Sequence, residues 1–281
     1  MLKILILLIT LICLPCVAAT DIKYTRISDE KSQYFVKLIK LALEKAGADK
    51  AYNLKESKQT FNQQQQVERL LSGELSIMWA GTQPEYENKL QPVRIPLMKG
   101  LQGHRIFLIR KGTQAEFDKV NTLQDLQQLK AGQGRFWGDT PILEHAGLPV
   151  VAPVKKENLF YMLDGARFDY LPLGVHEPWD EVNKRENINL AVEQSLLLIY
   201  PMPMYFFVSK DNEKLRQIIE SGLEAAISDG SFDELFYNAP HVKNALDLAK
   251  LANRKVIKIA NPNLNNKTPI NRPELWLKLE E

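Results

Sequence analysis

The sequence predicts an α/β protein, because segments with helical spacing alternate with segments typical of buried strands along most of the chain. Its 281 residues suffice for one large domain or two lobes, each with its own core. With 45% apolar and 25% charged residues, the composition is that of a soluble globular protein. No internal repeat or long linker interrupts the alternation, so we expect mainly parallel sheets flanked by helices.

The first 19 residues are predicted to be a signal peptide. Lys3 supplies the positive start, residues 4–12 supply the apolar centre, and the small residues around Ala19 supply a cleavage site. Because the apolar run is too short to span a membrane, we expect a soluble protein exported to the periplasm. Both cysteines, Cys13 and Cys16, lie in this segment, which leaves the mature chain without thiols. Cys16 follows a proline rather than a small residue, so no lipid anchor is expected.

The elements of the first half follow from apolar spacing. Strands are predicted where apolar residues alternate or form short runs, at residues 22–27, 75–81 and 104–110. Helices are predicted where apolar residues recur every three or four positions, at residues 34–46 and 61–72, and a glycine follows each. Thr122 and Asp125 have the spacing of a capping box, which predicts a short helix there.

The second half continues the same alternation. Strands are predicted at residues 148–154, 168–175 and 188–193, and a helix at residues 157–166. Residues 196–210 contain two apolar runs separated by a Pro-Met-Pro break. A long amphipathic helix is predicted within residues 211–230, and Gly230 ends it. The Pro- and Asn-rich residues 261–276 are predicted to form an irregular surface tail.

The sequence contains no motif of a known catalytic or cofactor site. Nucleophile elbows, phosphate-binding glycine loops and zinc-binding helix motifs are absent, and the four histidines share no metal-ligand spacing. The net charge is +2 without a basic block, which argues against nucleic-acid binding. These absences favour ligand binding over catalysis, with no metal or cofactor expected.

Three segments carry a resemblance to a known family. Residues 215–236 form an amphipathic helix followed by Asp-Gly-Ser and a second short helix, residues 122–134 read as a helix leading into a glycine-containing strand, and residues 70–100 contain a strand, a turn and a return strand. In these features the chain resembles the family 3 extracellular solute-binding proteins, which have the type II periplasmic binding protein fold. The resemblance covers nearly all of the mature chain.

The resemblance implies two lobes with a ligand-binding cleft between them. Residues 20–109 and 207–281 would form lobe I, residues 110–206 would form lobe II, and two crossings of the chain would join them. Ligand binding would close the lobes by a hinge motion. The resemblance further implies a monomer that delivers a small polar solute, amino-acid-like or a related metabolite, to an ABC permease or reports it to a membrane sensor.

The sequence departs from amino-acid-binding relatives at the residue that would bind the ligand's carboxylate. In these relatives an arginine follows Pro-Glu in the turn after the lobe I strand, but Tyr86 stands there in this chain. A tyrosine hydroxyl can donate one hydrogen bond but cannot form a charged bidentate pair, so an α-amino acid ligand is in doubt. For the lobe II carboxylate of the relatives, this chain offers Asp169 and, farther along, His176 or Glu177.

Residues 132–147 form the main candidate site. They place glycines and a Phe-Trp pair before a predicted helix whose N-cap would be Asp139 or Thr140. In the type II fold this turn would face the cleft, with Trp137 against the ligand, and an Asp cap would suit a ligand that donates a hydrogen bond. The alternative is an ordinary capped helix after a glycine turn, with Trp137 as a buried plug.

Further candidates have equally ordinary structural explanations. Trp79 and Thr82, at the end of a lobe I strand, would line the cleft, although Trp79 fits a buried core equally well. Arg105 and Arg167 could supply the missing positive charge, or each could form a structural ion pair with an aspartate. Tyr161 and Trp179 complete a set of aromatic residues that would suit either a flat ligand or the core.

Two other functions stay open at this point. One is an enzyme on the same fold, a lyase of the cyclohexadienyl dehydratase type, in which Asp169, His176 or Glu177 would act as general acid or base. The other is an accessory or signalling module that needs no small ligand, which a cleft filled by the protein's own side chains would favour.

Overall fold

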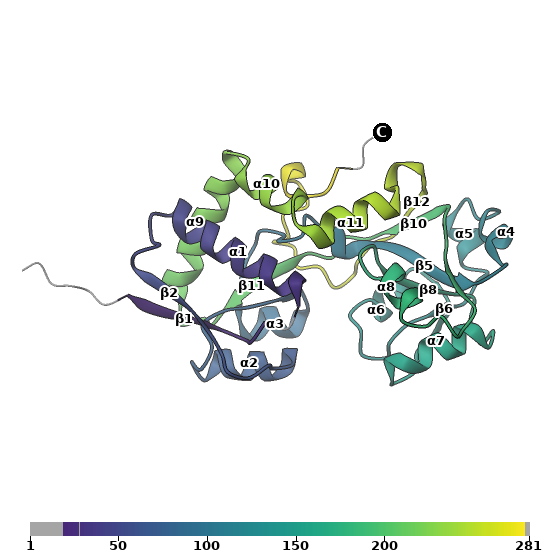
Figure 1. Cartoon of the computed structure of the whole chain (residues 1–281), viewed down its shortest axis with the longest axis horizontal. Helices are drawn as coiled ribbons and strands as arrows, with labels where there is room; N and C mark the ends of the chain where they lie inside the picture. Colours follow the sequence, from purple (N-terminus) through teal and green to yellow (C-terminus); the bar gives the residue numbers. More distant parts are fainter. Residues whose placement is uncertain (1–18, 28, 279–281) are drawn as a thin grey trace, which may run out of the picture.

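The computed structural model has two groups of helices and strands that lie side by side (Figure 1). The structure describes residues 19–27 and 29–278. The predicted signal peptide, with Cys13 and Cys16, lies outside the described residues except for Ala19. We call the part around the two smaller sheets lobe I and the part around the large sheet lobe II.

Lobe I contains two small sheets. In one of them β1 (Thr20–Tyr24) runs parallel to β2 (Tyr52–Glu56). In the other, β11 (Met204–Val208) lies between β3 (Met78–Gly81) and β4 (Gln91–Val93) and is antiparallel to both. Strand β11 is therefore distant in sequence from β3 and β4 and completes the sheet that these two strands begin.

Lobe II is built on a seven-stranded sheet. Its strands are β5 (His104–Arg110), β6 (Ala131–Gly132), β7 (Val150–Val151), β8 (Tyr170–Gly174), β9 (Leu190–Val192), β10 (Leu196–Ile199) and β12 (Lys255–Lys258). The order is β12-β10-β5-β8-β6-β7, and β9 pairs with β5 off this path. Strand β5 runs antiparallel to β8, β9 and β10, whereas β6 is parallel to β7 and β8, and β10 to β12.

The expected α/β class is confirmed, but the sheets are mixed rather than mainly parallel. The antiparallel pairs all involve β5 or β11. These are the first strands that the chain forms after passing from one lobe to the other, from β4 to β5 and from β10 to β11. Local apolar spacing predicts such a strand but carries no information about its direction within the sheet.

Helices cover the sheets of both lobes (Figure 1). Those beside the lobe I sheets are α1 (Glu30–Lys45), α2 (Gln63–Leu71), α3 (Pro84–Lys89), α9 (Glu213–Ser228) and α10 (Ser231–Tyr237). Those beside the lobe II sheet are α4 (Gln114–Phe117), α5 (Leu123–Leu126), α6 (Thr140–His145), α7 (Lys156–Asp164) and α8 (Pro178–Asn183). Helix α11 (Pro240–Ala249) and the 3₁₀ turns η1 (Leu101–Gly103), η2 (Leu251–Asn253) and η3 (Pro273–Leu275) complete the set.

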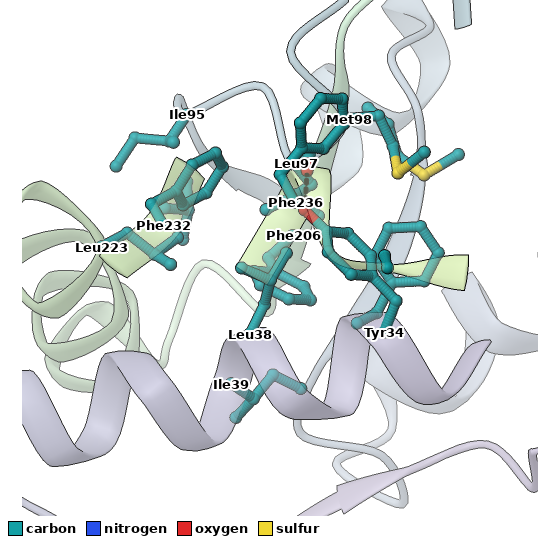
Figure 2. Packing of buried hydrophobic residues seen from close by; sticks show 14 of the residues in the cluster. Tyr34, Leu38, Ile39, Ile95, Leu97, Met98, Phe206, Leu223, Phe232 and Phe236 are labelled. Atoms are coloured by element: carbon teal, nitrogen blue, oxygen red, sulfur yellow. Dashed lines mark hydrogen bonds between the residues drawn. The ribbon is translucent and has the colours of Figure 1, made fainter. Parts of the chain in front are cut away.

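The core of lobe I forms where α1 and α9 pack together over the strands (Figure 2). Leu38 from α1 and Leu223 from α9 are fully buried, as is Phe206 from β11. Gly222 makes this close packing possible, because a Cβ at that position would overlap the backbone carbonyl of Ala42 in α1. Burial of these apolar side chains is the main force that stabilises the lobe.

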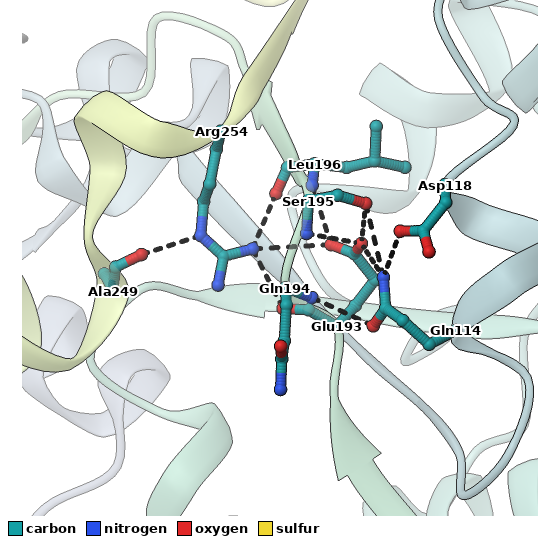
Figure 3. Close-up of polar contacts among 8 residues, drawn as sticks. All are labelled: Gln114, Asp118, Glu193, Gln194, Ser195, Leu196, Ala249 and Arg254. Carbon is teal, nitrogen blue, oxygen red and sulfur yellow. Dashed lines mark hydrogen bonds and ion pairs between the residues drawn. The ribbon is translucent and has the colours of Figure 1, made fainter.

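A buried polar network fixes the C-terminal segment to lobe II (Figure 3). The Glu193 side chain is fully buried and accepts hydrogen bonds from the backbone and hydroxyl of Ser195. Arg254 lies 3.4 Å from the Glu193 carboxylate and donates to the carbonyls of Ala249 (2.7 Å) and Leu196 (3.0 Å). Since Arg254 directly precedes β12, the network positions that strand beside β10.

The predicted lobe boundaries stay a prediction, but the sheet pairing departs from them at three places. Strand β11 begins at Met204 and pairs within a lobe I sheet, although residues 204–206 were predicted to belong to lobe II. Strand β5, placed mostly in lobe I from the sequence, pairs within the lobe II sheet. Strand β12, within residues 207–281, also joins that sheet, so the chain crosses between the lobes a third time after α10. The Glu193–Arg254 network explains this third crossing, because it satisfies a buried carboxylate with a residue from the C-terminal segment.

Candidate functional site

The turn between β6 and α6 brings the Phe-Trp pair to the space between the lobes. The Trp137 indole lies over Gly134, where an added Cβ would be 2.5 Å from the ring. The Thr140 hydroxyl donates to the Gly134 carbonyl (2.7 Å) and closes the turn. Phe136 projects into solvent, with 79% of its surface exposed. The glycine thus makes room for a half-buried aromatic ring that covers the turn.

Asp139 occupies the N-cap position of α6, but its side chain makes no capping hydrogen bond. Its carboxylate instead forms a buried ion pair with Arg105 and accepts a hydrogen bond from the Tyr200 hydroxyl (2.6 Å). The Arg105 guanidinium also lies 5.4 Å from the centre of the Tyr200 ring. Asp139 was expected to cap the helix with its side chain, which it does not do; the structural ion pair between Arg105 and an aspartate, left open as an alternative, is present instead.

The Arg105 guanidinium stays charged despite its burial. Burial alone would lower its pKa, but the charges of Asp139 and Glu177, together with a hydrogen bond to Tyr200, outweigh this effect and raise the pKa above the ordinary value. Burial raises the pKa of Tyr200 well above its ordinary range, so its hydroxyl stays protonated and can donate to Asp139. The three side chains form a fixed polar group where β5, β10 and the β6–α6 turn meet.

A cavity of about 240 Å³ lies between the lobes beside this group. The residues that lobe I and its connecting segments contribute are Gln63, Gly81, Gln83, Gln102 and Met204. Lobe II and the segments that connect it to lobe I contribute Arg105, Phe136, Trp137, Gly138, Asp139, Glu177 and Met202. The walls therefore come from both lobes, and they combine amides, charged groups, aromatic rings and thioethers.

Glu177 reaches the cavity from the loop between β8 and α8. Its Oε2 accepts a hydrogen bond from the backbone N–H of Gly174 (2.7 Å). The adjacent His176 accepts at Nε2 from the ammonium of Lys31 in α1 (2.8 Å), which joins the two lobes. Burial lowers the pKa of His176 well below its ordinary value, and the positive charges of Lys31 and Arg105 lower it further. The imidazole is therefore neutral at pH 7, as this hydrogen bond requires.

Four of the predicted site residues line the cavity: Arg105, Trp137, Asp139 and Glu177. Thr140 lies behind them, since its hydroxyl is used within the turn. These residues come from separate stretches of the sequence, and the folding of the large sheet of lobe II brings them to one place. Whether they bind a ligand stays a prediction.

The lobe I candidates are directed elsewhere. Trp79 stacks on Phe35 with ring centres 5.4 Å apart and packs against the lobe I core, in agreement with the structural alternative. The Thr82 hydroxyl donates to Glu87 (2.5 Å), although the residues on either side of Thr82 line the cavity. Tyr86 is buried in a core cluster and does not line the cavity; its hydroxyl donates to Gln63 (3.2 Å).

Two lobe II candidates lie at the wrong end of a strand. Arg167 is exposed, and Asp169 accepts a hydrogen bond from the backbone N–H of Lys130 (2.7 Å). Both precede β8, whereas Glu177 follows it. Five strand residues separate the two ends by roughly 17 Å. Asp169 therefore fixes a loop at the edge of lobe II, and the expectation that Arg167 and Asp169 lie at the cleft was wrong.

The amides and thioethers of the cavity were not among the predicted site residues. Gln63 belongs to a run of four glutamines within the predicted helix at residues 61–72, and Gln83 directly follows the predicted site residue Thr82. The Pro-Met-Pro break between two apolar runs was the available signal for Met202. Phe136 is part of the Phe-Trp pair within residues 132–147, but no local feature pointed to Gln102.

Two absences in the described part of the chain bear on the site. Among residues 19–27 and 29–278, no group of three or more His, Cys, Asp or Glu side chains is arranged to hold a metal ion. No helix within those same residues is both long enough and apolar enough to cross a membrane.

The chain matches no protein-family model and no curated protein sequence. It does resemble solved structures. It is 16% identical to the probable amino-acid ABC transporter extracellular-binding protein YtmK from Bacillus subtilis, with a TM-score of 0.58, and the match covers 80% of this chain and 99% of the other. A second neighbour is a periplasmic binding protein from Salmonella typhimurium, described for its high arginine specificity. It is 15% identical, with a TM-score of 0.51, and the match covers 77% of this chain and 97% of the other.

A third neighbour is the VFT2 domain of BvgS from Bordetella pertussis, which is 15% identical with a TM-score of 0.55 over 78% of this chain and 92% of the other. At these identities the similarity shows the fold alone. The neighbours are covered almost completely, so the similarity extends over both lobes rather than over one shared sheet. The predicted type II periplasmic binding protein fold is therefore confirmed for this chain.

Proposed function

We propose that the protein is a solute-binding protein of the periplasm that holds a small polar solute between its two lobes. The observation that carries this proposal is the cavity between the lobes, with walls from both lobes and from the segments that connect them. A ligand in such a position contacts both lobes at once and so favours their closed arrangement. The volume of about 240 Å³ lies below the range of drug-sized pockets, which points to a solute of amino-acid size.

The proposed ligand contacts are Arg105, Trp137, Asp139 and Glu177, together with the exposed ring of Phe136. Two buried polar atoms in residues of this wall, Gln102 Oε1 and Arg105 Nε, have no hydrogen-bond partner within the protein. Because an unpaired buried polar atom is costly, these atoms support a role for a solute or ordered water beside them. The proposed lobes are those of the sequence analysis, with β5 and β12 assigned to lobe II and the whole of β11 to lobe I.

The proposed partner is an ABC permease or a membrane sensor, and the protein is proposed to act as a monomer. One neighbour in fold is named as an ABC transporter extracellular-binding protein and another is a domain of BvgS, so the fold accommodates more than one context. The predicted signal peptide supports a location outside the cytoplasm. No metal, cofactor or nucleic acid enters the proposal.

Neither alternative function has comparable support. The acid–base residues of the lyase hypothesis do not converge, because Asp169 lies at the opposite end of β8 and His176 is held by Lys31. The accessory module would be favoured by a cleft that the protein's own side chains fill, whereas this cleft contains a cavity. We therefore propose binding without turnover.

The test is a thermal-shift screen of the mature protein against amino acids, amines, organic acids and sugars. A solute that binds the folded state raises the melting temperature in proportion to the logarithm of its concentration. Phe136→Ala should weaken the shift, because the ring lines the cavity. Tyr161→Ala is the matched control, since this aromatic residue is also exposed (59%) and does not line the cavity.

Loss of the shift in Phe136→Ala but not in Tyr161→Ala would support the proposed site. An equal effect of both variants would contradict it, and no shift with any solute would contradict the function. If chromatography detected a product formed from a bound solute, the result would instead favour the lyase.

A further inference from the structure

The only cation among the residues that line the cavity is already paired. The Arg105 side chain is 4% exposed and forms an ion pair with the 9% exposed side chain of Asp139. The Tyr200 hydroxyl holds the same carboxylate oxygen, which fixes the pair from a third direction. A ligand carboxylate beside Arg105 would also lie beside Asp139, so like-charge repulsion would oppose the attraction of the guanidinium. The wall offers no free positive charge for an anionic solute.

The short helix after β3, where Tyr86 lies, does not supply a free positive charge either. Tyr86 is 7% exposed, its ring packs edge-on against Phe207, and its hydroxyl is directed to Gln63. The nearby Arg94 is paired with Glu87 and does not line the cavity. The lobe I side of the cavity therefore presents amides where a carboxylate ligand would need a cation.

The wall does offer groups that suit a positively charged solute. Glu177 contributes a carboxylate, and with Asp139 and Arg105 it leaves the three charged lining residues with one net negative charge. Arg105 and Lys31 lie near enough to Glu177 to interact with its charge, but Lys31 is not a lining residue and its ammonium is bonded to His176. Glu177 is thus the lining carboxylate without an ion-pair partner in the wall.

Aromatic rings and amide oxygens complete a cation-binding surface. Trp137 and Phe136 both line the cavity, and an aromatic face attracts an ammonium or guanidinium group. The three glutamines of the wall, Gln63, Gln83 and Gln102, carry carbonyl oxygens that can accept hydrogen bonds from such a group.

We propose that the cavity binds a small organic cation that lacks a carboxylate group, an alkyl amine or an alkyl guanidine, rather than an α-amino acid. This inference rests on the proposed solute-binding function and adds the chemical class of the solute. The Glu177 carboxylate and the aromatic rings hold the cationic group, and the Arg105–Asp139 pair disfavours solutes with an added carboxylate.

The test compares amines with the amino acids that differ from them only by the carboxylate. Isothermal titration calorimetry of the mature protein would use cadaverine against lysine, putrescine against ornithine, and agmatine against arginine. We expect at least one amine to bind tenfold or more tightly than its amino-acid partner. Equal or tighter binding of the amino acid in every pair that binds would overturn the inference.

Two variants examine the charges that carry the inference. Glu177→Gln should weaken binding of the preferred amine tenfold or more, whereas Asp180→Asn, an exposed carboxylate in α8 that does not line the cavity, should leave it unchanged. Asp139→Asn should reduce the preference for the amine over its amino acid, because it releases the charge of Arg105. An unchanged preference in Asp139→Asn, or equal effects of the other two variants, would contradict the proposed roles.

The two proposals fail in distinguishable ways. If none of the three pairs binds but another solute raises the melting temperature, the solute-binding function stands and the organic-cation inference is wrong. If no solute in either experiment binds, the solute-binding function itself is wrong.

Discussion

Replacing Asp139 by asparagine should destabilise the protein strongly. The substitution preserves the shape of the side chain but removes the negative charge that faces Arg105, whose side chain is 4% exposed. Removing one partner of a buried ion pair typically costs about 3–5 kcal/mol, because the other charge stays buried without compensation. At about 2–4 °C per kcal/mol for a chain of this size, the melting temperature should fall by roughly 6–20 °C.

Urea unfolding followed by tryptophan fluorescence would measure this effect within a double-mutant cycle. The cycle combines Asp139→Asn with Arg105→Leu, which removes the charge that would stay unpaired. Since an apolar residue in place of a buried ion pair is often close to neutral, the double variant should recover most of the lost stability. A cost below about 1 kcal/mol for Asp139→Asn, or simple addition of the two single effects, would refute the reasoning.

Three further predictions concern stability. Gly132→Ala should cost about 1–3 kcal/mol in urea unfolding, because its Cβ would overlap the Phe168 ring. Gly138→Ala is the control and should change stability by less than about 0.5 kcal/mol, since its Cβ would lie 3.6 Å from Met202 Cε. Equal costs of the two variants would contradict the packing argument. Burial lowers the pKa of His104 to about 4, so between about pH 6.5 and pH 4 the unfolded chain binds a proton at this imidazole that the folded chain does not. Stability should therefore fall as the pH falls through this window, by up to roughly 3 kcal/mol. Melting scans of the wild type and His104→Gln would check this, and identical pH slopes would refute it. Arg254→Ala should cost about 3–5 kcal/mol, measured by urea unfolding, because it leaves the fully buried Glu193 carboxylate without its cation; a loss under about 1 kcal/mol would contradict this role.

Much of the fold was predictable because its elements depend on neighbours in the sequence. The capping box of Thr122 and Asp125 is present, and Gly47 and Gly230 adopt the positive φ angles expected after helices. Such signals act over three or four residues, so the chain carries them whatever the rest of the molecule does. Local spacing does not predict the directions of β5 and β11 or the pairing of β12 with β10, because these depend on strands that are distant in the sequence.

The candidate site shows the same division. The β6–α6 turn and its Phe-Trp pair were visible in the sequence, and the structure brings Trp137 and Asp139 to the cavity. The role of Asp139 was not visible, because local spacing identified it as a helix cap. Asp169 had the expected residue type and a strand beside it, yet it lies at the end of β8 that is remote from Glu177.

The sequence by itself determined the alternation of helices and strands, the positions of the turns and the absence of known catalytic motifs. Only the tertiary structure decided which charges meet in the cavity. Arg105 is 34 residues from Asp139, and Tyr200 is 61 residues from it, yet the three side chains form one buried group. Short-range hydrogen bonds and apolar spacing act within a few residues, whereas an ion pair depends on distance in space, which the packing of the whole chain sets.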